Sequence, residues 1–129
     1  MADYGMTITI DGSFDEVKPR VLAALKEQGF GVLTTIDMQA AMREKLGVTM
    51  ERYEILGACN PPLAHRAVEA DRDIGLLLPC NVIVQQINKT HVEVSAVDPV
   101  ASMQGVENPR LASIAGEVRD LLKQAVEGL

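Results

Sequence analysis

Residues 80–97, CNVIVQQINKTHVEVSAV, decide how this chain folds. Two apolar-rich runs, residues 80–87 and 91–97, are separated by the short segment NKT, which is typical of two antiparallel strands joined by a hairpin turn. The second run alternates Val92, Val94 and Ala96 with His91, Glu93 and Ser95. Because side chains along a strand point alternately to opposite faces, this pattern predicts a sheet with one buried face and one face in water.

Three more strands are predicted before the hairpin, at residues 6–11, 30–36 and 52–59. The third of these would place Tyr53, Ile55, Gly57 and Cys59 on one face and Glu54, Leu56 and Ala58 on the other. Each of the three is followed by apolar residues at helical spacing, so strands and helices are expected to alternate along the chain.

The first helix is expected directly after Ser13. Ser13 and Glu16 have the spacing of a capping box, and apolar residues then recur at helical intervals before Gly29: Phe14, Val17, Val21, Leu22 and Leu25. Pro19 conflicts with this pattern, because a proline inside a helix lacks a donor and crowds the preceding turn. The helix therefore either kinks at Pro19 or begins later.

The next helices are marked by their caps. Asp37 can cap a short helix that ends at Leu46, with Gly47 in the left-handed conformation as its stop. Asn60 and Pro61 can begin another helix, whose apolar stripe is Leu63, Ala67 and Val68. The charged residues 71–73 after it are interpreted as a solvated helix end.

The last helix has the most regular pattern. Asn108 and Pro109 can begin it, and its apolar residues follow at helical spacing: Leu111, Ile114, Val118, Leu121, Leu122 and Ala125. A hairpin together with helices that each carry one apolar stripe predicts an α+β fold, with helices packed on one face of a largely antiparallel sheet. No linker or repeat interrupts residues 1–129, so we expect a single domain.

The charge of the chain argues against two classes of partner. Eighteen acidic and twelve basic side chains give a formal net charge of -6. No basic run offsets this charge, so neither nucleic acid nor an anionic membrane is expected to bind. The sequence also shows no secretory signal and no apolar run near the roughly 20 residues that a membrane span requires. We expect a soluble, cytoplasmic protein.

Each of the two cysteines is followed by an asparagine, as Cys59-Asn60 and Cys80-Asn81. Cys59 is predicted to end a strand just before a helix N-terminus, where backbone donors and the helix dipole favour a thiolate. If the strands that carry the two thiols are neighbours, both Cys-Asn units meet at one end of the sheet. The two asparagines would then surround the sulfur atoms.

The same residues have structural interpretations. A free cysteine often behaves as a small buried hydrophobic residue, and asparagine before proline is common in turns. His65 could face Cys59 and activate it, although a solvent-facing His65 is favoured. Cys59, His65, Cys80 and His91 do not have the close ligand spacing of a zinc site, so we expect no metal and no cofactor.

Motifs of the familiar enzyme classes are missing from the sequence. It contains no glycine-rich phosphate loop, no serine elbow, no metalloprotease helix and no close pair of cysteines. The sequence thus gives no positive support for an enzyme and leaves the question open.

Several long stretches resemble one protein family. These stretches are LGV at 46–48, LGACNPPLAHRAVEAD at 56–71, IGLLLPCNVIV at 74–84 and VSAVDP at 94–99, with GFGVLTTID and the closing helix in addition. They are similar to the bacterial and archaeal family known as domain of unknown function family 302. The resemblance implies a curved sheet backed by helices, like half of a TATA-binding protein, and commonly a homodimer. It does not imply DNA binding, because this acidic chain lacks a basic saddle.

Three functions remain open at this point. The first is a homodimeric module that binds a small molecule or an anion in a pocket formed by Cys59, Asn60, His65, Cys80 and Asn81. The second is a homodimer with a structural or interaction role and no ligand. The third is a thiol-dependent redox or metal-handling protein that uses both cysteines.

Overall fold

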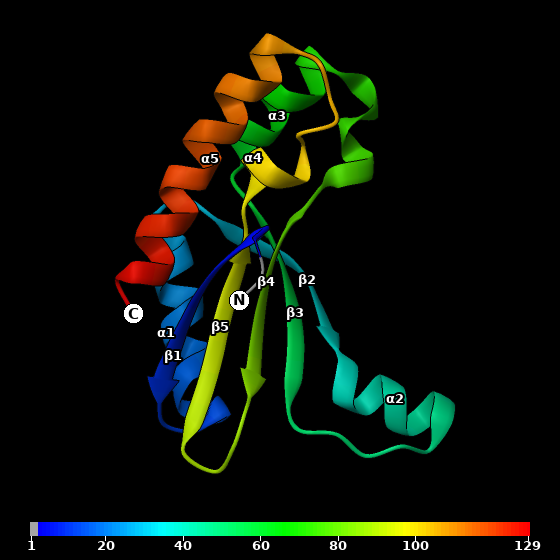
Figure 1. Ribbon diagram of the computed structural model, residues 1–129, viewed down its shortest axis with the longest axis vertical. Helices are drawn as coiled ribbons and strands as arrows, with labels where there is room; N and C mark the ends of the chain where they lie inside the picture. Colours follow the sequence, from blue (N-terminus) through cyan, green and yellow to red (C-terminus); the bar gives the residue numbers. More distant parts are fainter. Residues whose placement is uncertain (1–2) are drawn as a thin grey trace.

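The computed structural model describes residues 3–129, which form a five-stranded antiparallel sheet with helices on one face (Figure 1). The strands are β1 (Gly5–Asp11), β2 (Gly31–Asp37), β3 (Tyr53–Cys59), β4 (Cys80–Gln86) and β5 (His91–Val97). The helices are α1 (Phe14–Glu27), α2 (Met38–Leu46), α3 (Pro61–Ala70), α4 (Pro99–Ser102) and α5 (Pro109–Glu127), with a 3₁₀-helix, η1 (Arg72–Leu77). The predicted α+β class is confirmed.

The strands lie in the order β1-β5-β4-β3-β2, and each neighbouring pair is antiparallel. The predicted hairpin is β4–β5, closed by a hydrogen bond of 3.0 Å from Ile87 N to His91 O. Val92, Val94 and Ala96 are buried, as their alternation predicts. β3 lies beside β4, so the strands that carry the two cysteines are neighbours.

The first helix begins where the capping box predicts. Ser13 Oγ accepts a hydrogen bond from Glu16 N (3.3 Å) and donates one to Glu16 Oε1 (2.9 Å). The alternative of a later start is wrong, because α1 runs from Phe14 to Glu27 with Pro19 inside it. Pro19 is exposed, so water can reach the carbonyl of the preceding turn that Pro19 leaves without a donor.

The predicted caps of the later helices are confirmed, and two predicted stripe residues are not. Asp37, Asn60 and Asn108 each accept a hydrogen bond from a backbone N–H of the first turn. Leu22 on α1 and Val68 on α3 are exposed instead of buried. Each follows a buried residue directly, and successive residues of a helix are about 100° apart, which turns both side chains off the buried stripe.

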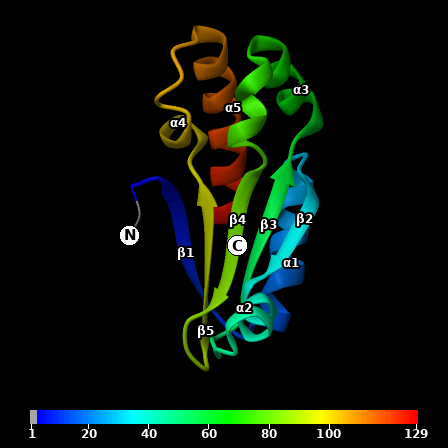
Figure 2. The same ribbon diagram turned by 90° about the vertical axis from the view of Figure 1, so that its right-hand side faces the viewer.

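The apolar core has two parts. One lies between the sheet and the helices α1 and α5, and includes Val82, Val94 and Leu122. The other lies beyond the end of the sheet, where Leu63 and Ala67 of α3 and Ile74 of η1 pack against the N-terminal half of α5. Figure 2 shows α5 passing beyond the sheet toward α3. Within residues 3–129, none of the helices has the length and apolar character needed to cross a membrane.

Candidate functional site

The two cysteines lie at the same end of the sheet. Cys59 is the last residue of β3, and Cys80 is the first residue of β4. In the β3–β4 pairing Cys80 lies opposite Ala58, one residue before Cys59. Both cysteines are free thiols. The prediction that the two cysteines meet at one end of the sheet is therefore confirmed.

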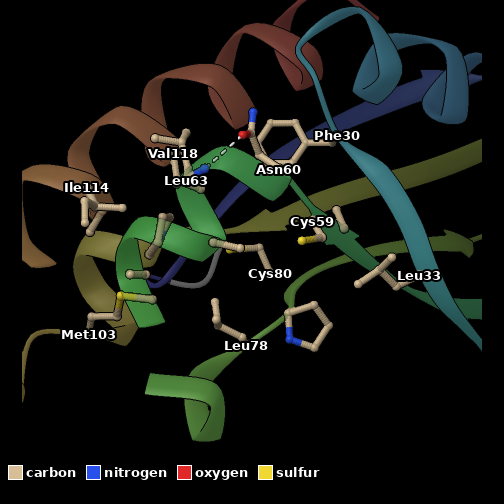
Figure 3. Close-up of a pocket in the computed structure, with 16 residues that line it drawn as sticks. Phe30, Leu33, Cys59, Asn60, Leu63, Leu78, Cys80, Met103, Ile114 and Val118 are labelled. Atoms are coloured by element: carbon tan, nitrogen blue, oxygen red, sulfur yellow. Dashed lines mark hydrogen bonds between the residues drawn. The ribbon is translucent and has the colours of Figure 1, made fainter. Parts of the chain in front are cut away.

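Both cysteines line a cavity of about 280 Å³ between this end of the sheet, α3 and α5 (Figure 3). The lining residues are Phe30, Leu33, Ala58, Cys59, Asn60, Leu63, Ala64, Ala67, Leu78, Pro79, Cys80, Pro99, Met103, Ile114, Ala115 and Val118. Among these described residues none carries a formal charge, and Asn60 contributes the one amide. The volume lies just below the roughly 300–1,000 Å³ of typical small-molecule pockets.

Small side chains leave this space open. Ala64 and Ala67 border it from α3, Ala115 borders it from α5, and Ala58 borders it from β3. Protein interiors are usually packed as closely as organic crystals, whereas this space is partly open to solvent and keeps its apolar wall uncovered. Leucine or phenylalanine at the same positions would fill the space.

The two thiols differ in their environment. Cys80 is buried, whereas Cys59 is half-buried. Burial, and to a lesser degree the charge of a nearby Cys59 thiolate, raises the pKa of Cys80 to about 11. Cys80 is therefore an uncharged thiol at neutral pH. In Figure 3 the sulfur atom of Cys59 points toward the cavity. Because Cys59 is half-buried and Cys80 is buried, Cys59 is the more accessible thiol.

Asn60 is largely occupied by the fold. Its Oδ1 accepts a hydrogen bond from Leu63 N (3.3 Å), and its Nδ2 donates one to Gln28 O (3.5 Å). Gly29 has a φ of 85°, and a Cβ at this position would lie 3.0 Å from Asn60 Nδ2. Asn60 thus caps α3 and holds the segment between α1 and β2 in place.

The other two candidate residues lie outside the cavity. The side chain of His65 is 75% exposed, and its Nδ1 lies 3.2 Å from Glu69 Oε1. Asn81 lies opposite Gly57 and follows Cys80, so strand alternation turns it to the open face of the sheet. There it borders a separate groove with Tyr4 and Tyr53. The structure therefore brings together Cys59, Asn60 and Cys80, but not His65 and Asn81.

The family described as Domain of unknown function DUF302 matches residues 6–129. The chain belongs to the DUF302 family. The crystal structure of an uncharacterized conserved DUF302 protein from Bacillus stearothermophilus is similar, with a TM-score of 0.89 and 28% sequence identity over 98% of each chain. A search of the curated proteins gave no match. The DUF302 membership confirms the resemblance, and the shared fold agrees with the architecture described above.

Several residues that line the cavity were not predicted from the sequence as parts of a site. Met103 follows α4, Ile114 and Val118 lie on α5, and Leu33 lies in β2. Leu33 falls where the β2–β3 register shifts, and such bulges change the direction in which a side chain points. One signal was present in the sequence, because the apolar face of α3 carries small residues where larger ones would complete a core.

The groups at the cavity indicate which ligands it suits. Within residues 3–129, no group of three or more His, Cys, Asp or Glu side chains is placed to hold a metal ion. The cavity instead offers apolar carbon surface, two thiols and the thioether of Met103. These groups suit an uncharged, polarisable ligand.

Proposed function

We propose that this protein binds a small, uncharged and largely apolar molecule in the cavity between β3, α3 and α5. The observation that carries the proposal is the wall of the cavity, which is built almost entirely from carbon and sulfur. Moving apolar surface out of water into such a space is favourable by about 25 cal/mol per Å². A thioether such as that of Met103 also favours contact with an aromatic ring of a ligand.

An anion, the other ligand class considered from the sequence, is less well supported. No lysine, arginine or histidine is among the described residues that line the cavity. The N–H of Leu63, in the first turn of α3, already donates to Asn60 Oδ1. An anion in this space would lose its hydration without gaining a charged partner.

The proposal is tested with the fluorescent apolar probe N-phenyl-1-naphthylamine. Wild-type protein should bind it saturably with one site per chain. Ala64→Phe places a ring in the cavity and should therefore weaken binding by about tenfold or more. A tenfold change in affinity corresponds to about 1.4 kcal/mol. The matched control is Ala23→Phe, at an exposed position of α1, which should bind as wild type does.

A cooperative thermal unfolding transition in each variant is the check that both variants are folded. Absence of saturable binding to wild type, or equal binding by wild type and Ala64→Phe, would refute the proposal. A purely structural role without a ligand, the second function that the sequence leaves open, predicts no saturable binding to wild type.

A second candidate function is thiol chemistry, which the presence of both cysteines at one cavity supports. Cys59 would be the reacting thiol, because it is accessible, whereas Cys80 is buried and protonated at neutral pH. Mass spectrometry of protein isolated from cells separates the two functions. If the protein only binds a ligand, Cys59 should carry no covalent adduct; if Cys59 reacts, wild type should carry an adduct at this residue, and Cys59→Ser should carry none while it still binds the probe.

A further inference from the structure

A second hollow lies on the face of the sheet that α1 and α5 leave open. Figure 2 shows this face toward the viewer, with both helices behind the sheet. A groove of about 440 Å³ extends here over β3, β4, β5 and the start of β1. The described residues that line the groove all differ from those that line the apolar cavity. The groove is therefore a separate candidate site.

The chemistry of this groove also differs from that of the cavity. Its polar and aromatic lining residues are Tyr4, Thr7, Tyr53, Asn81, Glu93 and Ser95. Glu93 carries the one formal charge among the described lining residues, and these include no lysine, arginine or histidine. A molecule in the groove therefore meets a negative charge, aromatic rings and several hydrogen-bonding groups.

Glu93 is half-buried and has no cation as a partner among the described residues. None of the ion pairs within residues 3–129 includes it. Its carboxylate accepts one side-chain hydrogen bond, which Gln85 Nε2 donates to Oε1 over 3.4 Å. His91, the preceding residue of β5 on this face, lies instead beside Asp11, with 3.0 Å between Nε2 and Oδ1. The Glu93 charge is thus held in position but not neutralised.

This unpaired charge restricts what can bind in the groove. An uncharged molecule that covered the groove would take the Glu93 carboxylate out of water without giving it a partner, which is costly. An anion would also be repelled by the carboxylate. A cation instead replaces the lost water by a charge-assisted hydrogen bond. The net charge of -6 on the chain also attracts cations to the protein.

The register of the sheet places an aromatic ring and hydroxyl groups around Glu93. Tyr53 lies opposite Gln85, and Gln85 lies opposite Glu93. Two strand spacings, about 10 Å, therefore separate the backbones at Tyr53 and Glu93, so a ligand above Gln85 can contact both side chains. The Ser95 hydroxyl, two residues along β5 from Glu93, lies 2.7 Å from the Thr7 hydroxyl. Hydroxyl oxygens have further lone pairs that accept hydrogen bonds from an ammonium group.

We infer that the groove binds a small organic cation, namely an amine with an apolar body. The Glu93 carboxylate and the Ser95 hydroxyl hold the ammonium group, while the apolar body lies on Ile83 beside the ring of Tyr53. The negative face of an aromatic ring also attracts a cation. The inference does not rest on the proposed function, because the groove and the cavity share no described lining residue.

The inference is tested with phenethylamine, which is a cation at neutral pH, and with its uncharged analogue phenethyl alcohol. In a nuclear magnetic resonance titration, phenethylamine should shift the amide signals around Ile83 and Ser95 saturably. Phenethyl alcohol lacks the charge and should bind there about tenfold more weakly. Glu93→Gln keeps the size of the side chain and should weaken phenethylamine binding by about the same factor.

The matched control is Glu44→Gln, at an exposed position of α2, which changes the net charge equally and should bind phenethylamine as wild type does. A second variant, Tyr53→Leu, removes one ring from the groove and should weaken binding about threefold. N-phenyl-1-naphthylamine should bind to Glu93→Gln as tightly as to wild type, because its cavity lies elsewhere.

Three results would overturn the inference. These are the absence of saturable shifts around Ile83 and Ser95, equal affinity of the groove for the two phenethyl probes, and equal weakening by Glu93→Gln and Glu44→Gln. The last result would show a general effect of net charge instead of a contact with Glu93. A wild type that binds phenethylamine but not N-phenyl-1-naphthylamine would refute the proposed function and support this inference.

Discussion

Cys59 and Cys80 lie on the paired strands β3 and β4 and line the same cavity, although 20 residues separate them in the sequence. Their environments differ, because Cys80 is buried in the wall and Cys59 is half-buried. This asymmetry does not resemble a pair of equivalent thiols built to bridge or to share a metal ion. It fits a cavity in which one thiol contributes packing surface and the other remains within reach of a ligand.

Cys80 should make the stability of the protein fall at alkaline pH. Its pKa is raised from the ordinary value of 9.0 to about 11, so between these values the unfolded chain has released this proton while the folded chain still holds it. The contribution to stability is complete below pH 9 and is lost progressively up to pH 11, by up to about 3 kcal/mol. Urea unfolding of wild type and Cys80→Ala across this range checks the prediction. The same pH dependence in both proteins would contradict it.

The two thiols should react with N-ethylmaleimide at different rates. Cys59 is the more accessible and should be modified first, and N-phenyl-1-naphthylamine should slow the reaction of both cysteines by filling the cavity. Mass spectrometry of proteolytic peptides at successive times measures each rate separately. Faster modification of Cys80, or rates that the probe leaves unchanged, would show that the cavity is not the route to these sulfur atoms.

Gly57→Ala should distort the wall of the cavity. A Cβ at position 57 would meet the hydroxyl of Thr34 and would lie 2.8 Å from Cγ of Pro79, which lines the cavity. Overpacking of this kind costs about 1–3 kcal/mol, and probe binding should weaken with it. Gly31→Ala is the control, because a Cβ there meets nothing within 4 Å. Chemical denaturation measures both variants, and equal stabilities would refute this description of the wall.

Glu54→Gln should destabilise the sheet through a buried charge. The Glu54 carboxylate is buried, with Lys18 Nζ at 2.6 Å and Arg52 Nη2 at 3.7 Å. Removing its charge takes from Lys18 the carboxylate with which it pairs, whereas Arg52 keeps a second one, Asp15 Oδ1 at 3.2 Å. Because both cations are partly exposed, the expected loss of about 1–3 kcal/mol is below that of a fully buried pair.

The control for Glu54→Gln is Glu117→Gln, which removes a surface pair with Arg66 at 3.0 Å. Pairs of this kind contribute about 0–1 kcal/mol. Urea unfolding at low and at high salt measures both variants, and a larger loss for Glu117→Gln would contradict the argument.

Local sequence patterns were sufficient for much of this fold. Alternation predicted the β4–β5 hairpin and its buried valines, and the capping residues Ser13, Asp37, Asn60 and Asn108 predicted where four helices begin. These features depend on neighbours within a few residues. The pairing of β3 with β4 was assumed in order to bring the cysteines together, and the sheet confirms it.

The cavity depends on distant contacts that no local pattern encodes. Ile114 and Val118 reach it because α5 continues past the end of the sheet. The bulge at Leu33 adds one residue to β2 without a clear signal in the sequence. Asn81 was grouped with Cys80 as its neighbour, yet adjacent residues of a strand point to opposite faces, and this rule would have separated them.

The most direct test of the central claim is a measurement of nuclear Overhauser effects between N-phenyl-1-naphthylamine and the methyl groups of the protein. The bound probe should show effects to Leu63, Met103, Ile114 and Val118, which surround the cavity. Effects confined to exposed side chains such as Leu76, or none to the cavity methyl groups, would contradict the claim that this cavity is a binding site.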